Sequence, residues 1–289
     1  MSLDKLDYET LIAKTENDEL EELADVYHQL GRLSVNINRA ISFYKRSIEI
    51  NLDYKPTDYD LLYITYINLA ILLTKRNDYD EALKYYRRAL NLDFRERESN
   101  QLRIANRYNQ IGVILKLQKN YKEALKYFHD ALHIQINIIS SDDLILIPTY
   151  HNLSSTYCLI QDYTSSIDYY EKSLQIIKEN LPQQRSLLAY TYNKLGTIFC
   201  FIKDYNKAYS CQKKALEIQI DMVSSDHHPS LATRHFNMAV SLEGLKRFQE
   251  SIDHITQAID ILQQRTSGIH QRKISRYQKY LDILRNLND

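Results

Sequence analysis

The sequence predicts an all-α fold: a right-handed superhelix of about six helical hairpins with a capping segment at each end. Five similar segments, beginning with DYDEALKYYRRAL and NYKEALKYFHDAL, follow one another at intervals of 42, 42, 42 and 43 residues. Five other segments precede them at the same intervals, each centred on a small residue. Self-similarity at a fixed period of this length is typical of stacked helical repeats. The aromatic residues that mark the first set are Tyr79, Tyr121, Tyr163, Tyr205 and Phe248, and the small residues that mark the second are Ala70, Gly112, Ser154, Gly196 and Ala239.

The composition agrees with a folded, helix-rich chain. Of 289 residues only five are glycine and four are proline, whereas 44% are hydrophobic and 26% are charged. Lys plus Arg (37) balances Asp plus Glu (37), so the chain lacks the basic field with which nucleic-acid-binding proteins attract phosphate. The most apolar stretch, residues 61–73, is too short to span a bilayer. We therefore expect neither a nucleic-acid partner nor a membrane partner.

Each unit contains two segments with helical apolar periodicity, joined by a turn of three or four residues. The polar residue before each aromatic predicts the start of the second helix, because its side-chain oxygen can cap the free amide groups there. Glu81 and Glu123 follow their caps by three residues and predict two capping boxes. All prolines fall between units, where a helix can begin. The predicted caps are Asp78, Asn120, Asp162 and Asp204, and the prolines are Pro56, Pro148, Pro182 and Pro229.

An earlier segment, RAISFYKRSI at Arg39–Ile48, has the same pattern and adds a sixth unit, for which Ala24 is the small residue. The predicted domain organisation has an N-terminal capping segment at 1–17 and a C-terminal capping helix at 269–289. Between them we expect six repeats, at about 18–56, 57–98, 99–141, 142–183, 184–226 and 227–268.

The order of small, large and aromatic residues within one unit resembles the signature of the tetratricopeptide repeat. The 42-residue period and the segment SSDHHPSLATRHFNMA resemble the kinesin light chain subtype of that family. A hairpin of 42 residues also fits the HEAT or armadillo class, although the offsets of the small residues favour the tetratricopeptide repeat. The residues that carry the resemblance are Ala70, Leu73, Tyr79, Ala82, Tyr86 and Ala89, and again Gly112, Leu115, Tyr121, Ala124, Phe128 and Ala131.

Three of the later units depart from the signature. The fourth has Ser166 and Ser173 where alanine is usual, the fifth has Gln212 at an aromatic position, and the sixth has Ser251 and Ile255. We expect these units to pack less ideally than the others.

The first helix of each unit should line the concave face of the superhelix, which is an extended binding surface in such proteins. An asparagine recurs there in five consecutive units, and side-chain amides can hold the main chain of an extended peptide. Alternatively, each asparagine bonds to a neighbouring backbone or repeat. The predicted groove residues are Asn68, Lys75, Asn109, Lys116, His151, Asn152, Ser155, Tyr190, Asn193, Thr197, Phe201 and Asn237.

These features predict a non-catalytic adaptor or scaffold that binds an extended peptide of a partner protein. The two ends of the chain carry opposite charge, net −7 over residues 1–25 and net +5 over 265–288, so an alternative is a scaffold that self-associates. A third is a kinesin light chain-like cargo adaptor without the coiled coil that binds the heavy chain. We expect a monomer or weak homo-oligomer.

Motifs for catalysis, cofactors or metals are not evident. The sequence contains no phosphate-binding glycine loop, dinucleotide fingerprint or HExxH pair. His129 and His133 are four residues apart but lack an evident third ligand for zinc. An acidic, polar N-terminal stretch and only three cysteines, too few for a disulfide framework, favour a cytoplasmic location. We therefore predict no enzyme activity, no cofactor and no metal.

Overall fold

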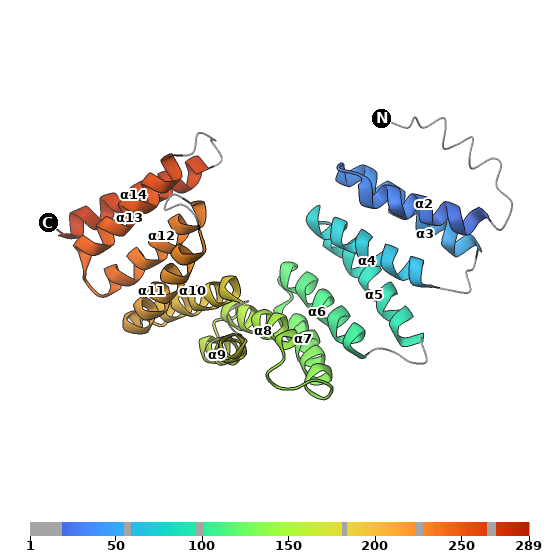
Figure 1. Ribbon diagram of the computed structural model, residues 1–289, viewed down its shortest axis with the longest axis horizontal. Coiled ribbons are helices and arrows are strands. Elements are labelled where there is room, and N and C mark those ends of the chain that lie inside the picture. The colour runs from blue at the N-terminus through green and yellow to red at the C-terminus, as the bar shows by residue number, and fades with distance from the viewer. Residues whose placement is uncertain are drawn as a thin grey trace. The chain divides into compact units, whose positions relative to one another are not determined.

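The computed structural model describes residues 19–54, 59–95, 101–180, 184–223, 228–264 and 270–288. Regular structure in these ranges is helical, which confirms the all-α fold class (Figure 1). The predicted N-terminal capping segment, residues 1–17, lies outside them. The chain divides into two compact units, up to Ile138 and from Ile139 onward, which are described separately.

The described residues of the first unit form three helical hairpins. Each helix packs against the next one along the chain, from α2 to α7. Consecutive hairpins therefore pack against each other through the second helix of one hairpin and the first helix of the next. The hairpins are α2 (Glu19–Leu33) with α3 (Ile37–Tyr54), α4 (Asp60–Lys75) with α5 (Tyr79–Arg95), and α6 (Gln101–Leu117) with α7 (Tyr121–Ile136).

In the second unit, the part of the chain that the structure describes forms three further hairpins and a last helix. After the short 3-10 helix η1 (Leu144–Leu146), each α-helix again packs on its successor, and α10 also contacts α12. The hairpins are α8 (Ile147–Leu159) with α9 (Tyr163–Glu179), α10 (Arg185–Phe201) with α11 (Tyr205–Met222), and α12 (Pro229–Gly244) with α13 (Phe248–Gln263). The final helix, α14 (Gln271–Asn288), packs on α13.

The turn inside each of five hairpins has the same backbone conformation. Its central residue adopts a left-handed φ of 60° to 67° although none of the five is glycine. In the α4–α5 turn, Asp78 N–H donates to Leu73 O at 2.9 Å and Asn77 N–H donates to Thr74 O at 3.0 Å. This is the Schellman pattern that ends a helix. The five residues are Asn77, Lys119, Gln161, Lys203 and Lys246.

The predicted helix caps are partly confirmed. The carboxylates of Asp162 and Asp204 accept from the amides at the third position of α9 and α11. The cap predicted for Asn120 is wrong, because its side chain makes no bond to the helix amides and instead donates to Glu123 at 2.7 Å. A bond between the two side chains replaces the reciprocal bonds of a capping box.

Two prolines stand at helix starts, as predicted. Pro148 lies in the first turn of α8, and α12 begins at Pro229. Pro56 and Pro182 lie outside the described residues.

Small residues on first helices allow large side chains of second helices to pack closely. A Cβ atom at Gly112 would lie 2.6 Å from the Phe128 ring, which is closer than packed atoms approach. In the first hairpin this role belongs to Gly31, whose Cβ would lie 2.7 Å from Tyr44. The assignment of Ala24 was wrong because α2 ends two residues after Gly31, so the small residue lies nearer the helix end.

The serines that depart from the signature are fully buried, and their hydroxyls are paired. Ser166 Oγ donates to the carbonyl of Ser154 at 2.8 Å, and Ser251 Oγ donates to the equivalent carbonyl of Ala239 at 2.7 Å. Buried hydroxyls with such partners carry little penalty. The serines are therefore accommodated by bonds between the two helices of a hairpin.

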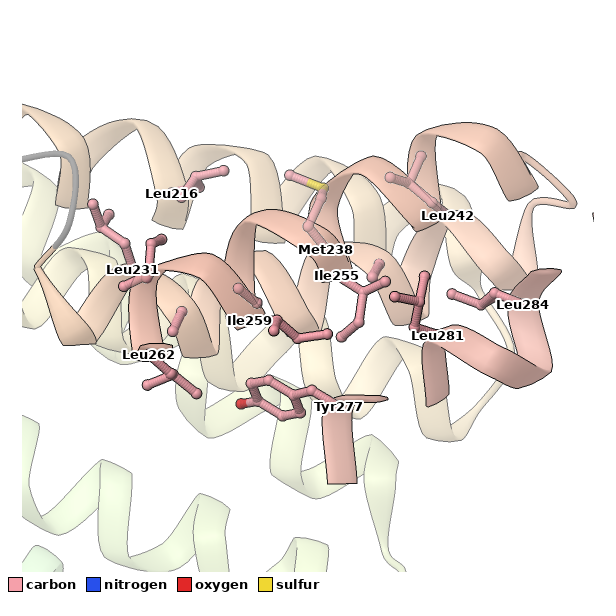
Figure 2. Packing of buried hydrophobic residues seen from close by; sticks show 14 residues of the cluster. Leu216, Leu231, Met238, Leu242, Ile255, Ile259, Leu262, Tyr277, Leu281 and Leu284 are labelled. Carbon is pink, nitrogen blue, oxygen red and sulfur yellow. The ribbon is translucent and has the colours of Figure 1, made fainter. Parts of the chain in front are cut away.

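The hydrophobic core of the last hairpin continues onto α14 (Figure 2). Met238 and Leu242 from α12 pack with Ile255 and Ile259 from α13, and residues of α14 complete the cluster. The α14 residues in the cluster are Tyr277, Leu281 and Leu284. One face of α14 is thus buried, and its other face remains available to line a surface.

Replacing Lys119 by glycine should stabilise the protein by about 0.5–1 kcal/mol, because glycine adopts a positive φ without steric cost. The midpoint of urea denaturation measures this change. Lys126→Gly, in the exposed middle of α7, is the control and should destabilise by about 1 kcal/mol. A loss of stability in both variants would contradict the strain assigned to Lys119.

Candidate functional site

The predicted groove residues all lie on the first helices of hairpins. In the first unit, Asn68 is half-buried on α4 and Asn109 is buried on α6. Lys75 is exposed at the end of α4, and the Lys116 ammonium lies 5.7 Å from the centre of the Phe128 ring. The positions by helix are Asn68 and Lys75 on α4; Asn109 and Lys116 on α6; His151, Asn152 and Ser155 on α8; Tyr190, Asn193, Thr197 and Phe201 on α10; and Asn237 on α12.

Asn68 is placed by a contact within its own unit. Burial raises the pKa of Tyr44, and the nearby side-chain amide of Asn68 opposes that rise. The Asn68 side chain on α4 therefore lies close to the Tyr44 hydroxyl on α3. This contact is of the kind expected if the asparagines stabilise repeat packing.

A buried ion pair in the first unit was not predicted. Asp93 on α5 and Arg107 on α6 are almost fully buried, with 3.6 Å between Asp93 Oδ2 and Arg107 Nε. Arg107 also donates to the Tyr63 hydroxyl at 2.5 Å, and Arg103 donates to Asp93 at 3.1 Å. Removing one partner of such a pair is strongly destabilising, since it leaves a buried charge. We interpret this cluster as a connector between hairpins.

His151 connects three helices of the second unit. Its Nε2 atom lies 2.7 Å from Ser173 Oγ on α9 and 3.1 Å from Thr191 Oγ1 on α10. The ring lies against Tyr170 and Tyr190, with centroids 5.3 and 5.4 Å away. Burial, and then the charge of Lys194, lower the pKa of His151 to about 4. The imidazole is therefore neutral at pH 7.

The first unit contains the same connector. His28 Nδ1 on α2 lies 2.8 Å from Thr65 Oγ1 on α4, and the His28 ring lies 5.4 Å from the ring of Tyr44 on α3. Burial lowers the pKa of His28 as well. Since both histidines join two consecutive hairpins through a threonine, this is a structural device of the repeat.

Two of the predicted asparagines are hydrogen-bonded to each other. Asn237 Nδ2 on α12 donates to Asn193 Oδ1 on α10 at 2.7 Å. The carbonyl of Asn193 also accepts from Thr197 Oγ1 at 2.9 Å and from Gln212 Nε2 at 3.2 Å. This pair leaves the Asn193 amide group and the Asn237 side-chain oxygen without hydrogen bonds to other described residues. Both side chains are half-buried, so a ligand can reach these groups.

A cavity of about 760 Å³ lies between α10, α12 and α14. Three of the predicted residues, Thr197, Phe201 and Asn237, line it together. The wall formed by α14 was not predicted, because the apolar stripe of this helix indicated only a capping role. The other lining residues are Cys200, Gln212, Phe236, Val240, Arg272, Ser275, Arg276, Lys279, Tyr280 and Ile283.

The walls of this cavity combine aromatic rings with positive charge. Phe236 stacks on Tyr277 with ring centroids 4.4 Å apart, and the Arg276 guanidinium lies 5.3 Å from the centre of the Phe236 ring. The Tyr280 hydroxyl donates to Glu243, a carboxylate that does not itself line the cavity. Within the described ranges, no acidic residue lines the cavity. The cavity therefore suits a ligand that has an apolar body and a negatively charged group.

Other chemistry is not evident among the described residues. They contain no group of three or more His, Cys, Asp or Glu placed to hold a metal ion. The three cysteines are free thiols. No helix in this part of the chain is both long and apolar enough to cross a membrane.

His151 should make stability depend on pH. Because its pKa is about 4 in the folded state and 6.5 in the reference state, the unfolded chain binds more protons between these values. The contribution of His151 to stability is therefore fully present above about pH 6.5 and falls on acidification, by about 2 kcal/mol at pH 5.

The variant His151→Asn cannot take up this proton. We expect the difference in unfolding free energy between wild type and His151→Asn to shrink by about that amount from pH 7 to pH 5, measured by urea denaturation. If the unfolding free energies of wild type and His151→Asn changed equally with pH, the pKa of His151 would not be lowered by folding.

Comparisons with known proteins agree with this architecture. The family model of the tetratricopeptide repeat matches residues 11–93, 103–179 and 187–264, which is more than half of the chain. The apo form of RapI superposes with a TM-score of 0.73 at 18% identity, over 98% of this chain and 74% of that chain. BtubC (BKLC) from P. vanneervenii gives 0.70 at 19% identity, over 79% of this chain and 91% of that chain.

Repeats of a putative kinesin light chain from Podosopora anserina give a TM-score of 0.62 at 15% identity, over 70% of this chain and 96% of that chain. No curated protein matched the sequence. Identities this low show a shared fold and leave function to the residues of the site. The predicted resemblance is confirmed, and the chain belongs to the tetratricopeptide repeat family.

Proposed function

We propose that this protein is a non-catalytic adaptor that binds an extended peptide segment of a partner protein along the first helices of its hairpins. Its tetratricopeptide repeats form a scaffold that is typical of protein–protein interaction. The observation that supports peptide binding is the Asn193–Asn237 pair beside the cavity of the second unit. The pair presents one amide donor and one amide acceptor, which match the acceptor and donor of a peptide unit.

The surroundings of the pair favour a mixed ligand. Phe201 is 56% exposed, a large value for an aromatic side chain, and it lies in the same cavity as Asn237. Exposed aromatic residues that line a concave surface are typical anchors for a partner. A segment that offers backbone groups to the asparagines and a hydrophobic side chain to Phe201 fits best. The cytoplasmic location and the monomeric or weakly oligomeric state stay predictions.

Replacing both Asn193 and Asn237 by alanine should abolish capture of the partner while changing the fold little. The double variant loses one hydrogen bond between helices, worth about 1 kcal/mol, so the melting temperature should fall by only a few degrees. Affinity capture from a cell lysate, read by mass spectrometry, measures which proteins are lost relative to wild type.

The matched control is Lys213→Ala with Glu217→Ala, which removes an exposed ion pair on α11. It should retain every partner, because exposed pairs contribute little and neither residue lies on a first helix. Equal capture by wild type, control and asparagine variant would place the binding surface elsewhere. A steep drop in melting temperature of the asparagine variant would assign the pair a structural role.

A further inference from the structure

We propose that the cavity between α10, α12 and α14 binds a small organic anion with a flat apolar body. This site goes beyond the proposed peptide-binding function, since it requires no partner protein. The cavity volume of about 760 Å³ lies within the range of small-molecule sites, roughly 300–1,000 Å³. Such sites have mostly apolar walls and a few placed polar groups.

One residue that lines the cavity, Gln212, is a substitution in the repeat. Gln212 on α11 occupies the position that an aromatic residue fills in the four preceding hairpins. A Cβ atom at Gly196 would lie 2.5 Å from the Gln212 amide, just as one at Gly112 would meet the ring of Phe128. The narrower side chain leaves room that a ring would fill. The equivalent aromatic residues are Tyr44, Tyr86, Phe128 and Tyr170.

The Gln212 side chain is also an incompletely satisfied polar group. It is 1% exposed, and its Nε2 atom donates to the Asn193 carbonyl at 3.2 Å. Its Oε1 atom is buried and has no hydrogen-bond partner in the described structure. A buried acceptor without a partner destabilises the fold, because it has lost its hydrogen bonds to water. A ligand that carries an N–H or O–H group, and that shifts this amide slightly, recovers part of that cost.

The apolar walls suit a flat ring system. Phe201 from α10, Phe236 and Val240 from α12 and Ile283 from α14 line the cavity. The stacking of Phe236 on Tyr277 fixes the plane of its ring. Aromatic ligands bind favourably beside rings that are already held in place.

The charge of the cavity is positive on one side. Arg272, Arg276 and Lys279 follow at helical spacing on the exposed face of α14, and all three line the cavity. Throughout the described ranges, no carboxylate forms an ion pair with any of them, and Glu243 is already held by the Tyr280 hydroxyl. Clustered cations beside low-dielectric walls attract an anion. The ligand therefore carries a carboxylate, sulfonate or similar group at the α14 side and its rings toward Gln212.

The probe that matches this chemistry is 8-anilinonaphthalene-1-sulfonate, which has a flat ring system, an N–H group and one negative charge. Titration of the full chain, followed by fluorescence, should show saturable binding at a single site. N-phenyl-1-naphthylamine has the same rings and N–H group without the sulfonate. Its affinity should be about tenfold lower, since it gains nothing from the cations of α14.

Two variants test the position of the site. Arg276→Glu reverses a lining charge and should weaken binding of the anionic probe by about tenfold or more. Gln212→Phe restores the aromatic residue of the four preceding hairpins and should abolish probe binding without lowering the melting temperature. Arg285→Glu is the control, because it makes the same charge change on α14 outside the cavity and should leave binding unchanged.

No saturable probe binding to wild type, or equal binding by wild type, Arg276→Glu and Gln212→Phe, would overturn the proposal. If Gln212→Phe lowers the melting temperature, Arg276→Glu alone decides, since Arg276 is exposed and makes no ion pair in the described structure. Loss of probe binding with partner capture intact, or the reverse, separates this site from the peptide-binding function. A peptide partner that displaces the probe would show that both ligands use the cavity.

Discussion

The close contact between a small residue on the first helix of a hairpin and a large side chain on the second is the constraint on which the rest of the fold depends. At Gly112, even one added carbon atom would collide with the Phe128 ring, and at Gly196 it would require the end of the Gln212 side chain to move. The contact therefore sets how near the two helix axes approach. Because each hairpin repeats it, the first helices present equivalent positions at equivalent depths. Asn193 lies three residues before Gly196 and Asn237 lies two residues before Ala239, and their side chains are hydrogen-bonded across two hairpins.

Substitutions in the interface between the two helices of a hairpin determine where the array becomes polar or contains a cavity. Where serine replaces alanine, as at Ser166 and Ser251, a bond to the facing carbonyl keeps the helices together. Where glutamine replaces a ring, at Gln212, the amide is only partly satisfied and a cavity lies beside it. The same rule of packing thus yields a closed hairpin in one repeat and a candidate ligand site in another.

Patterns within one hairpin were predictable from the sequence, because they depend on residues that are near one another along the chain. Helical periodicity and the caps at Asp162 and Asp204 belong to this class. Gly31 was missed because α2 ends only two residues after it, and sequence spacing does not reveal where a helix ends. The prediction that Asn120 caps α7 was wrong because its side chain carries an N–H donor as well as an acceptor oxygen. The donor bonds to Glu123, and the sequence does not show which of the two groups an asparagine uses.

Contacts between hairpins could not be predicted in the same way. Periodicity shows which face of α14 is apolar, but not that its other face forms a wall opposite Phe201 and Asn237. The buried pair of Asp93 and Arg107 was hidden for the same reason, since either residue alone looks like a solvated charge. The first-helix faces that line the site were therefore predictable from the sequence, whereas the combination of residues from α10, α12 and α14 is evident only in the structure.

The two proposed ligands share residues, and this has a thermodynamic consequence. A peptide held by Asn193 and Asn237 with an anchor beside Phe201 occupies space that a small anion in the cavity also needs. Each ligand then lowers the apparent affinity of the other, and the coupling is reciprocal. An organic anion would act as a competitor of the partner protein, and its effect would be confined to the last two hairpins and α14. The hollow at Gln212 would in that case make a repeat scaffold responsive to a small molecule without any change in its helical frame.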